Sequence, residues 1–154
     1  MKEFAEQYLI ATKTFLDLVE SLTFEQLDVA NSEGWNARQV IHHMADSEAQ
    51  SYARLRRLIA EPGTSIQGYD EGLWAENTTL SYKNHEIESS LEVFKAVRKS
   101  SYELLLRLDD SFLTNKGVHT ESGEYSVKDW LNSYIKHPVD HANQIKEIRD
   151  LLIT

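Results

Sequence analysis

The sequence predicts an all-α protein, in which four long helices form a bundle and residues 1–154 make up one domain. Three observations predict this fold. Apolar residues recur at steps of three and four in four separate stretches, which is the period of an α-helix. Only six Gly and two Pro occur among the 154 residues, too few for a fold dominated by turns. No stretch shows the alternating pattern that the strands of an extensive sheet would need.

The first two helices are indicated by apolar stripes and by capping signals. The stripe of the first helix comprises Phe4, Tyr8, Thr12, Phe15 and Val19. After it, the segment TFEQLD resembles a capped turn. The second helix is expected to begin after Asn36, a preferred N-cap residue, and to end near Glu61, because Pro62 and Gly63 follow.

Longer connections precede each of the last two helices. The third helix is expected over about Glu86–Leu108, and the fourth begins at Ser126, where SVKD resembles a capping box with Asp in the position of Glu. Residues 62–85 are long enough to carry the chain from one end of a bundle to the other, so we expect a crossover between the second and third helices. Residues 109–125 include Gly117 and Gly123, within the string NKGVHTESGEYS, and this pattern predicts a small hairpin.

Composition and charge exclude several classes of protein. The chain has no Cys, which excludes disulfides, thiolate zinc sites and cysteine nucleophiles. Asp and Glu number 25 against 16 Lys and Arg, giving a net charge of −9, so we expect no nucleic-acid partner. The amino terminus lacks the pattern of a signal peptide, and no apolar run approaches the roughly 18 residues of a membrane span. We therefore expect a cytoplasmic protein that does not bind membranes.

A pair of histidines on the last helix is the strongest chemical signal. At the roughly 100° per residue of an α-helix, His137 and His141 lie about 40° apart, inside the apolar stripe that includes Trp130 and Tyr134. Two histidines at this spacing can bind one metal ion. The alternative interpretation is a pair of core histidines whose nitrogens are satisfied by hydrogen bonds.

The second helix offers further candidates. His42 is expected to face away from the core, whereas His43 lies at the edge of the stripe, where it can reach a neighbouring helix. Glu48 lies within the stripe, and a buried carboxylate without a partner is costly. It is a candidate metal ligand, a hydrogen-bond acceptor for a ligating histidine or a general base. The alternative for Glu48 is a salt bridge with Arg98 of the third helix.

Two separated blocks of the sequence carry a family pattern. The first is GWNARQVIHHMADSEAQSYARLRRLIAE followed by YDEGLWAE, and the second is SGEYSVKDWLNSYIKHPVDHANQI. From about Asp28 to Leu152 the chain resembles the DinB-like superfamily and, within it, the YfiT-type metal-dependent hydrolases. The resemblance implies a four-helix bundle with a long crossover between its second and third helices. It also implies one divalent metal ion per chain, zinc or nickel, held by three histidines.

Carried over residue by residue, the family's metal ligands fall on His43, His137 and His141. The chain departs from its YfiT-type relatives in having Glu48, Val139 and Asp140 where those relatives have histidine. In addition, Pro138 removes a hydrogen bond from the helix directly after a predicted ligand. The site is expected to survive if the freed carbonyl of Tyr134 finds another partner.

These features together predict a metal-dependent enzyme with a small-molecule substrate. Three histidines leave an open coordination position, as catalytic metal sites do. The resemblance implies either a hydrolase or a transferase that joins a low-molecular-weight thiol to an electrophile. Glu48 is the candidate catalytic residue for proton transfer, and we expect Tyr69, Asp70 and Trp74 to cover the mouth of the site.

A different class of function is the alternative. In it the protein is a non-catalytic, metal-stabilised dimer or a binding module of a stress response. Removal of the metal would then lower stability without affecting any small-molecule chemistry. We expect a homodimer, because bundles of this kind often pair through exposed helix faces.

Overall fold

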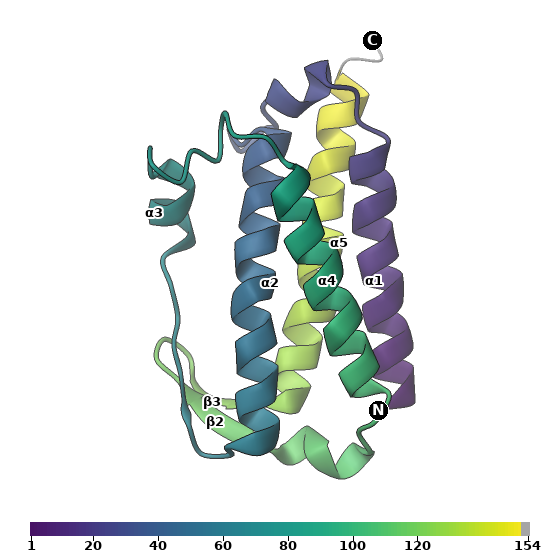
Figure 1. Ribbon diagram of the computed structural model, residues 1–154, viewed down its shortest axis with the longest axis vertical. Coiled ribbons are helices and arrows are strands. Elements are labelled where there is room, and N and C mark those ends of the chain that lie inside the picture. Colours follow the sequence, from purple (N-terminus) through teal and green to yellow (C-terminus); the bar gives the residue numbers. More distant parts are fainter. Residues whose placement is uncertain (152–154) are drawn as a thin grey trace.

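Four long helices make up most of the chain, as the apolar stripes predict. The computed structural model describes residues 1–151, and its four long helices pack side by side as a bundle (Figure 1). They are α1 (Lys2–Glu20), α2 (Ala37–Ala60), α4 (Glu88–Leu105) and α5 (Val127–Leu151). The all-α bundle expected from the sequence is thus confirmed. Within residues 1–151, no helix is both long and apolar enough to span a membrane.

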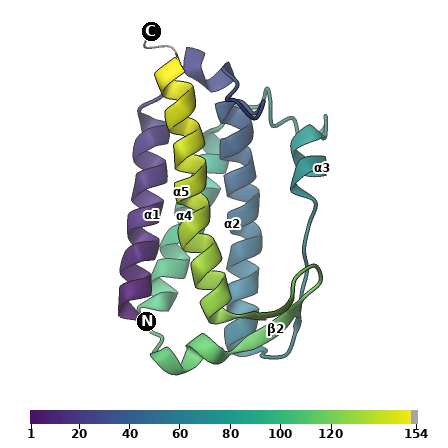
Figure 2. The ribbon, with the colours of Figure 1, turned by 180° about the vertical axis from the view of Figure 1, so that it is seen from behind.

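The helices run in an up–down–down–up order. In Figure 1, α1 and α5 ascend while α2 and α4 descend, so α2 and α4 are parallel neighbours. Because α2 ends at the opposite end of the bundle from the start of α4, the chain must return along its full length. Residues 61–87 make this return, which confirms the predicted crossover, and they include the short helix α3 (Glu71–Glu76) beside α2 (Figure 2).

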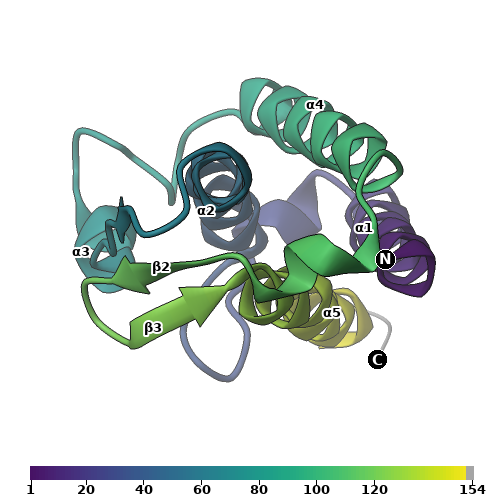
Figure 3. The same ribbon diagram turned by 90° about the horizontal axis from the view of Figure 1, so that it is seen from below.

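A small sheet joins the crossover to the hairpin before α5. The strands β2 (Lys116–His119) and β3 (Gly123–Ser126) form the predicted antiparallel hairpin, and β1 (Ser65–Ile66) of the crossover pairs in parallel with β2. Figure 3 shows the hairpin extending beside the bundle toward α3. No pattern in the sequence indicated β1, because two residues are too few to show an alternating pattern. Short 3₁₀ helices, η1 (Glu25–Asp28) and η2 (Asp110–Thr114), complete the connections.

The predicted caps are present. The Asn36 side chain accepts a hydrogen bond from the Gln39 backbone at 2.9 Å, and the Gln39 side chain accepts one from the Asn36 backbone at 3.1 Å. Asp129 and Ser126 exchange equivalent bonds at the start of α5. Such reciprocal bonds satisfy amide groups that have no partner within the helix. They explain why α2 and α5 begin where the sequence indicated.

Two apolar clusters fill the bundle, one toward each end. One cluster includes Phe15, Met44, Phe94 and Ile145, and its members on α1 and α5 lie in the second halves of those helices. The other cluster includes Tyr8, Leu55, Leu105, Trp130 and Tyr134. On α1, α2 and α4 the buried polar residues Thr12, Glu48 and Arg98 lie in sequence between members of the two clusters.

Candidate metal centre

Three histidine side chains meet between α2 and α5. His43 projects from α2, and His137 and His141 project from successive turns of α5. The Nε2 atom of His137 lies 3.1 Å from Nε2 of His43 and 2.9 Å from Nε2 of His141. One ligand nitrogen from each histidine lies within 4.8 Å of the other two. The three residues singled out from the sequence therefore form one cluster.

Helix α5 continues unbroken through Pro138. The proline lacks the amide that would bond to the Tyr134 carbonyl four residues earlier, and Arg98 Nη1 donates to that carbonyl instead, at 2.7 Å. The helix therefore keeps its turn between His137 and His141, and both imidazoles face α2. Arg98 thus supplies the partner that the Tyr134 carbonyl was expected to need if the site is to survive Pro138.

A hydrogen-bonded chain determines which nitrogen of His141 carries the proton. Nε2 of the Gln144 amide donates to the Glu33 carboxylate, which can only accept. Oε1 of Gln144 is therefore the atom 2.6 Å from His141 Nδ1, and an amide oxygen also only accepts. Nδ1 of His141 consequently carries the proton, which leaves a lone pair on Nε2. Neither Gln144 nor Glu33 was singled out from the sequence, because nothing in its local pattern indicates the contact.

Burial keeps the histidines neutral. Burial, together with the nearby His141, lowers the pKa of His43 from its ordinary 6.5 to about 3. Burial and the two neighbouring histidines lower the pKa of His137 to about 2. The pKa of His141 is also lowered by burial, although its hydrogen bond to Gln144 opposes the shift. Neutral imidazole is the form that binds metal ions.

The donor set fits a divalent metal ion. A proton on His137 Nε2 can be donated to only one of the two neighbouring nitrogens at a time, whereas a metal ion can bind all three lone pairs at once. Nitrogen atoms 2.9–3.1 Å apart can each lie at the roughly 2.0–2.1 Å that separates zinc from a histidine nitrogen. Imidazole ligands suit zinc, nickel, copper and iron.

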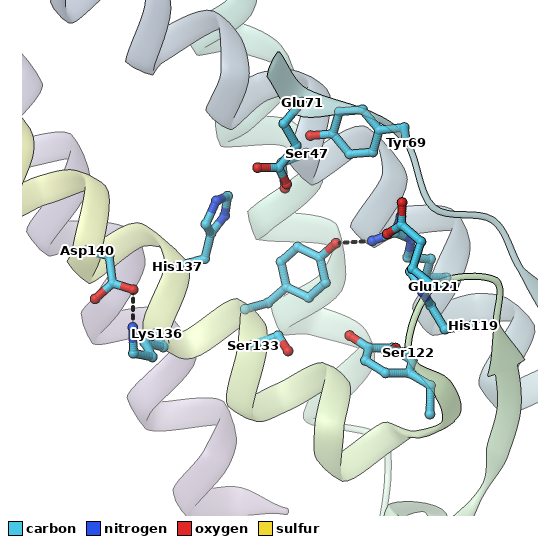
Figure 4. A pocket seen from close by; sticks show the side chains of 13 residues that line it. Ser47, Tyr69, Glu71, His119, Glu121, Ser122, Ser133, Lys136, His137 and Asp140 are labelled. Atoms are coloured by element: carbon cyan, nitrogen blue, oxygen red, sulfur yellow. Dashed lines mark hydrogen bonds and ion pairs between the residues drawn. The ribbon is translucent and has the colours of Figure 1, made fainter. Parts of the chain in front are cut away.

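The cluster adjoins a cleft of about 390 Å³, and His137 forms part of its wall. The other lining residues come from α2, the crossover, the hairpin and α5 (Figure 4). They are Ser47, Arg54, Tyr69, Glu71, His119, Glu121, Ser122, Tyr125, Ser133, Tyr134, Lys136 and Asp140. A small molecule bound in this cleft would lie against the histidine cluster.

Glu71 brings a carboxylate to the cluster that sequence reasoning missed. Its Oε2 lies 3.9 Å from Nε2 of His43, and its side chain is 55% exposed, facing the cleft. In Figure 4 the carboxylate points toward the imidazole of His137. Partial burial raises the pKa of Glu71, and the positive charge of Arg54 opposes this rise. The segment YDEGLWAE was noted for its family pattern and for Tyr69, Asp70 and Trp74, but Glu71 was not singled out from the sequence.

The residues expected at the mouth of the site have separate roles. Tyr69 lines the cleft and packs against Trp74, with ring centroids 4.7 Å apart. Asp70 caps α3 by accepting a hydrogen bond from the Leu73 backbone at 2.9 Å. Asp70 and Trp74 therefore position the crossover, while Tyr69 and Glu71 face the cleft.

Glu48 and His42 lie in the interior. Glu48 is fully buried, its Oε1 lies 3.0 Å from Arg98 Nη1, and it is not among the residues that line the cleft. The salt bridge that was the alternative for Glu48 is present, and the proposed role of Glu48 in proton transfer stays a prediction. His42 was expected to face outward, but it is buried against α4. There its Nδ1 lies 2.7 Å from Ser90 Oγ and its Nε2 lies 3.1 Å from the His85 carbonyl.

The fold and the site define a class of protein: a helical bundle with a three-histidine cluster on an open cleft. The family model of the DinB superfamily matches residues 7–145, and the chain belongs to this superfamily.

Known relatives agree with this assignment. A protein of Oceanobacillus iheyensis named "Putative metal-dependent hydrolase" is 38% identical over 131 residues, which cover 84% of this chain and 74% of that protein. A protein of the same name from Bacillus mycoides is 31% identical, with 87% and 76% covered. The structure is similar to YfiT from Bacillus subtilis, described as "a probable metal-dependent hydrolase with an unusual four-helix bundle topology". The TM-score is 0.86 at 26% identity, and 98% of this chain and 86% of that chain are covered.

Proposed function

We propose that this protein is a metal-dependent enzyme that binds one divalent ion per chain, zinc or nickel, through Nε2 of His43, His137 and His141. The observation that carries this proposal is the convergence of the three nitrogens beside a cleft. Three protein ligands leave room for a further ligand, which is the arrangement of catalytic rather than structural sites. When bound there, the ion would polarise a substrate group or lower the pKa of a nucleophile.

Hydrolysis of a small molecule is the reaction that the surrounding residues support best. Glu71 presents a carboxylate to the space between the histidines and the cleft, where it can accept a proton from an attacking water molecule and return it to the leaving group. Because the pKa of Glu71 is raised towards neutral pH, its carboxylate can both accept and release a proton more readily. Glu48 is held by Arg98 in the interior and does not line the cleft.

A low-molecular-weight thiol is the second candidate nucleophile for the same site. The chain has no Cys, so the sulfur would have to come from the substrate. Glu71 would then take the thiol proton, and the thiolate would attack an electrophile held in the cleft. The two reactions share the histidines and Glu71 and differ in what occupies the cleft.

Metal content tests the proposal. The protein is stripped with a chelator, reloaded separately with zinc and nickel, and analysed by mass spectrometry. We expect about one ion per chain in the wild type and a loss of binding in the His43→Ala, His137→Ala and His141→Ala variants. His42→Ala is the matched control, because it removes the neighbouring buried histidine and should leave binding intact. Equal metal content in His42→Ala and His43→Ala would contradict the assignment.

A further inference from the structure

Arg98 connects all four long helices from inside the bundle. Its guanidinium is fully buried, and it donates from Nε to Thr12 Oγ1 and from Nη2 to the Tyr8 carbonyl, both at 2.8 Å. Nη1 donates to Glu48 Oε1 at 3.0 Å and to the Tyr134 carbonyl at 2.7 Å. The four acceptors lie on α1, α2 and α5, and Arg98 itself lies on α4.

One of these four bonds lies next to the metal site. The Tyr134 carbonyl is the one that Pro138 deprives of its helical partner, and Pro138 lies between His137 and His141 in the sequence. A buried carbonyl left without a donor is costly, so the helix would tend to bend or admit water at this point. The bond from Arg98 satisfies the carbonyl and ties this turn of α5 to α4.

Stability alone does not account for this arrangement. Replacing a buried ion pair by apolar residues of similar volume is often neutral or stabilising, so the pair formed by Glu48 and Arg98 is not needed to hold a bundle together. A planar guanidinium constrains the positions of its hydrogen-bond acceptors, because its five N–H donors have a fixed geometry. Here that geometry sets the position of α5 relative to α1, α2 and α4.

We propose that Arg98, oriented by Glu48, is a positioning residue for the metal centre. It replaces the hydrogen bond that Pro138 removes and so fixes the turn of α5 that aims His137 and His141 at His43. This inference rests on the proposed metal-binding function. It assigns to two buried charged residues a role in metal affinity, although neither is one of the three proposed ligands and neither lines the cleft.

The first experiment removes the charged pair without leaving an isolated charge. In Glu48→Met/Arg98→Met the Tyr134 carbonyl has no donor, and in the same variant with Pro138→Ala the new backbone amide can supply one. Zinc affinity is measured on the stripped proteins by competition with a chromophoric chelator. We expect the double variant to bind zinc about 10- to 100-fold more weakly, the range for residues that support metal ligands. Adding Pro138→Ala should bring the affinity back to within a few-fold of Pro138→Ala alone.

Two further measurements separate positioning from general stability. Leu58→Ala removes core packing from α2 without touching the carbonyl, so it should lower the melting temperature and leave zinc affinity unchanged. The visible spectrum of bound Co²⁺ reports coordination geometry, so its bands should change in the double variant and return with Pro138→Ala. If the double variant does not fold, Arg98→Lys with and without Pro138→Ala takes its place, because one ammonium group cannot reach all four acceptors.

The outcomes distinguish this inference from the proposed function. Wild-type protein that binds no metal would overturn both. Wild-type protein that binds zinc, with equal affinity in the double variant or no recovery on adding Pro138→Ala, would overturn the positioning role and leave the metal site standing. Weakened binding that Pro138→Ala restores, together with recovery of the Co²⁺ spectrum, is the result that supports it.

Discussion

Gln144 holds His141 in the orientation that a metal ligand needs. Its amide oxygen accepts a hydrogen bond from His141 Nδ1 at 2.6 Å, and its amide nitrogen is in turn bound to Glu33. A carboxylate at the end of such a chain makes the imidazole a better donor to a metal ion, because it stabilises positive charge on the ring. The arrangement spans α5 and the loop before α2.

Replacement of Gln144 should weaken metal binding. In Gln144→Leu the proton on Nδ1 loses its acceptor and the ring can turn, so we expect zinc affinity to fall about 10-fold or more. Titration of the stripped protein with zinc in the presence of a competing chelator measures the change. The nearby Asn143→Leu, on an exposed position of the same helix, is the control. Equal zinc affinities in the two variants would show that the hydrogen bond from His141 to Gln144 does not affect metal binding.

Glu71 should affect turnover more than metal binding. Glu71→Gln keeps the shape of the side chain and removes its ability to take a proton, so we expect kcat for a small ester substrate to fall about 100-fold. Zinc content should remain near one ion per chain. Glu76→Gln, in the last turn of the same short helix, should match the wild type. Wild-type turnover in Glu71→Gln would exclude it as the proton acceptor.

Gly117 is required where the hairpin meets the crossover. A Cβ atom at this position would lie 2.6 Å from the Thr64 carbonyl oxygen, which is backbone and accepts a hydrogen bond from Val118 at 2.9 Å. Gly117→Ala should therefore separate β1 from β2 and lower the free energy of unfolding by about 1–3 kcal/mol. Urea denaturation measures this value. Gly72→Ala, where an added Cβ makes only an ordinary contact, should be neutral or slightly stabilising.

The metal-free protein should lose stability as the pH falls below about 6.5. The pKa values of His43 and His137 are lowered by burial to about 3 and about 2, whereas the same residues in the unfolded chain titrate near 6.5. Between these limits the unfolded chain binds more protons, so the free energy of unfolding decreases as the pH falls. Melting temperatures of the chelator-treated protein from pH 8 to pH 4 test this.

A variant without His43 and His137 isolates the cause of that pH dependence. In His43→Phe/His137→Phe the two titrating groups are replaced by rings of similar shape, so the melting temperature should vary less over the same pH range. An unchanged slope would assign the acid sensitivity to other groups.

The sequence by itself determined the four long helices and the pair of metal-ligand candidates on the last of them. Apolar periodicity and the caps at Asn36 and Ser126 depend on neighbours within a few residues, so they can be read along the chain. The spacing of His137 and His141 on one face follows from helical geometry in the same way. The family resemblance selected His43 over His42 as the third ligand, and it agreed with the crossover that the length of residues 62–85 had indicated.

Only the tertiary structure decided the partners of these residues. Glu48 was open to several roles, and packing placed it against Arg98. The donor that compensates for Pro138 comes from α4, and Glu33 bonds to Gln144 across 111 positions of the sequence. Glu71 reaches His43 because β1 and α3 hold the crossover beside α2. Hydrogen bonds between distant segments depend on where helices pack in space, and no local pattern of residue types records that.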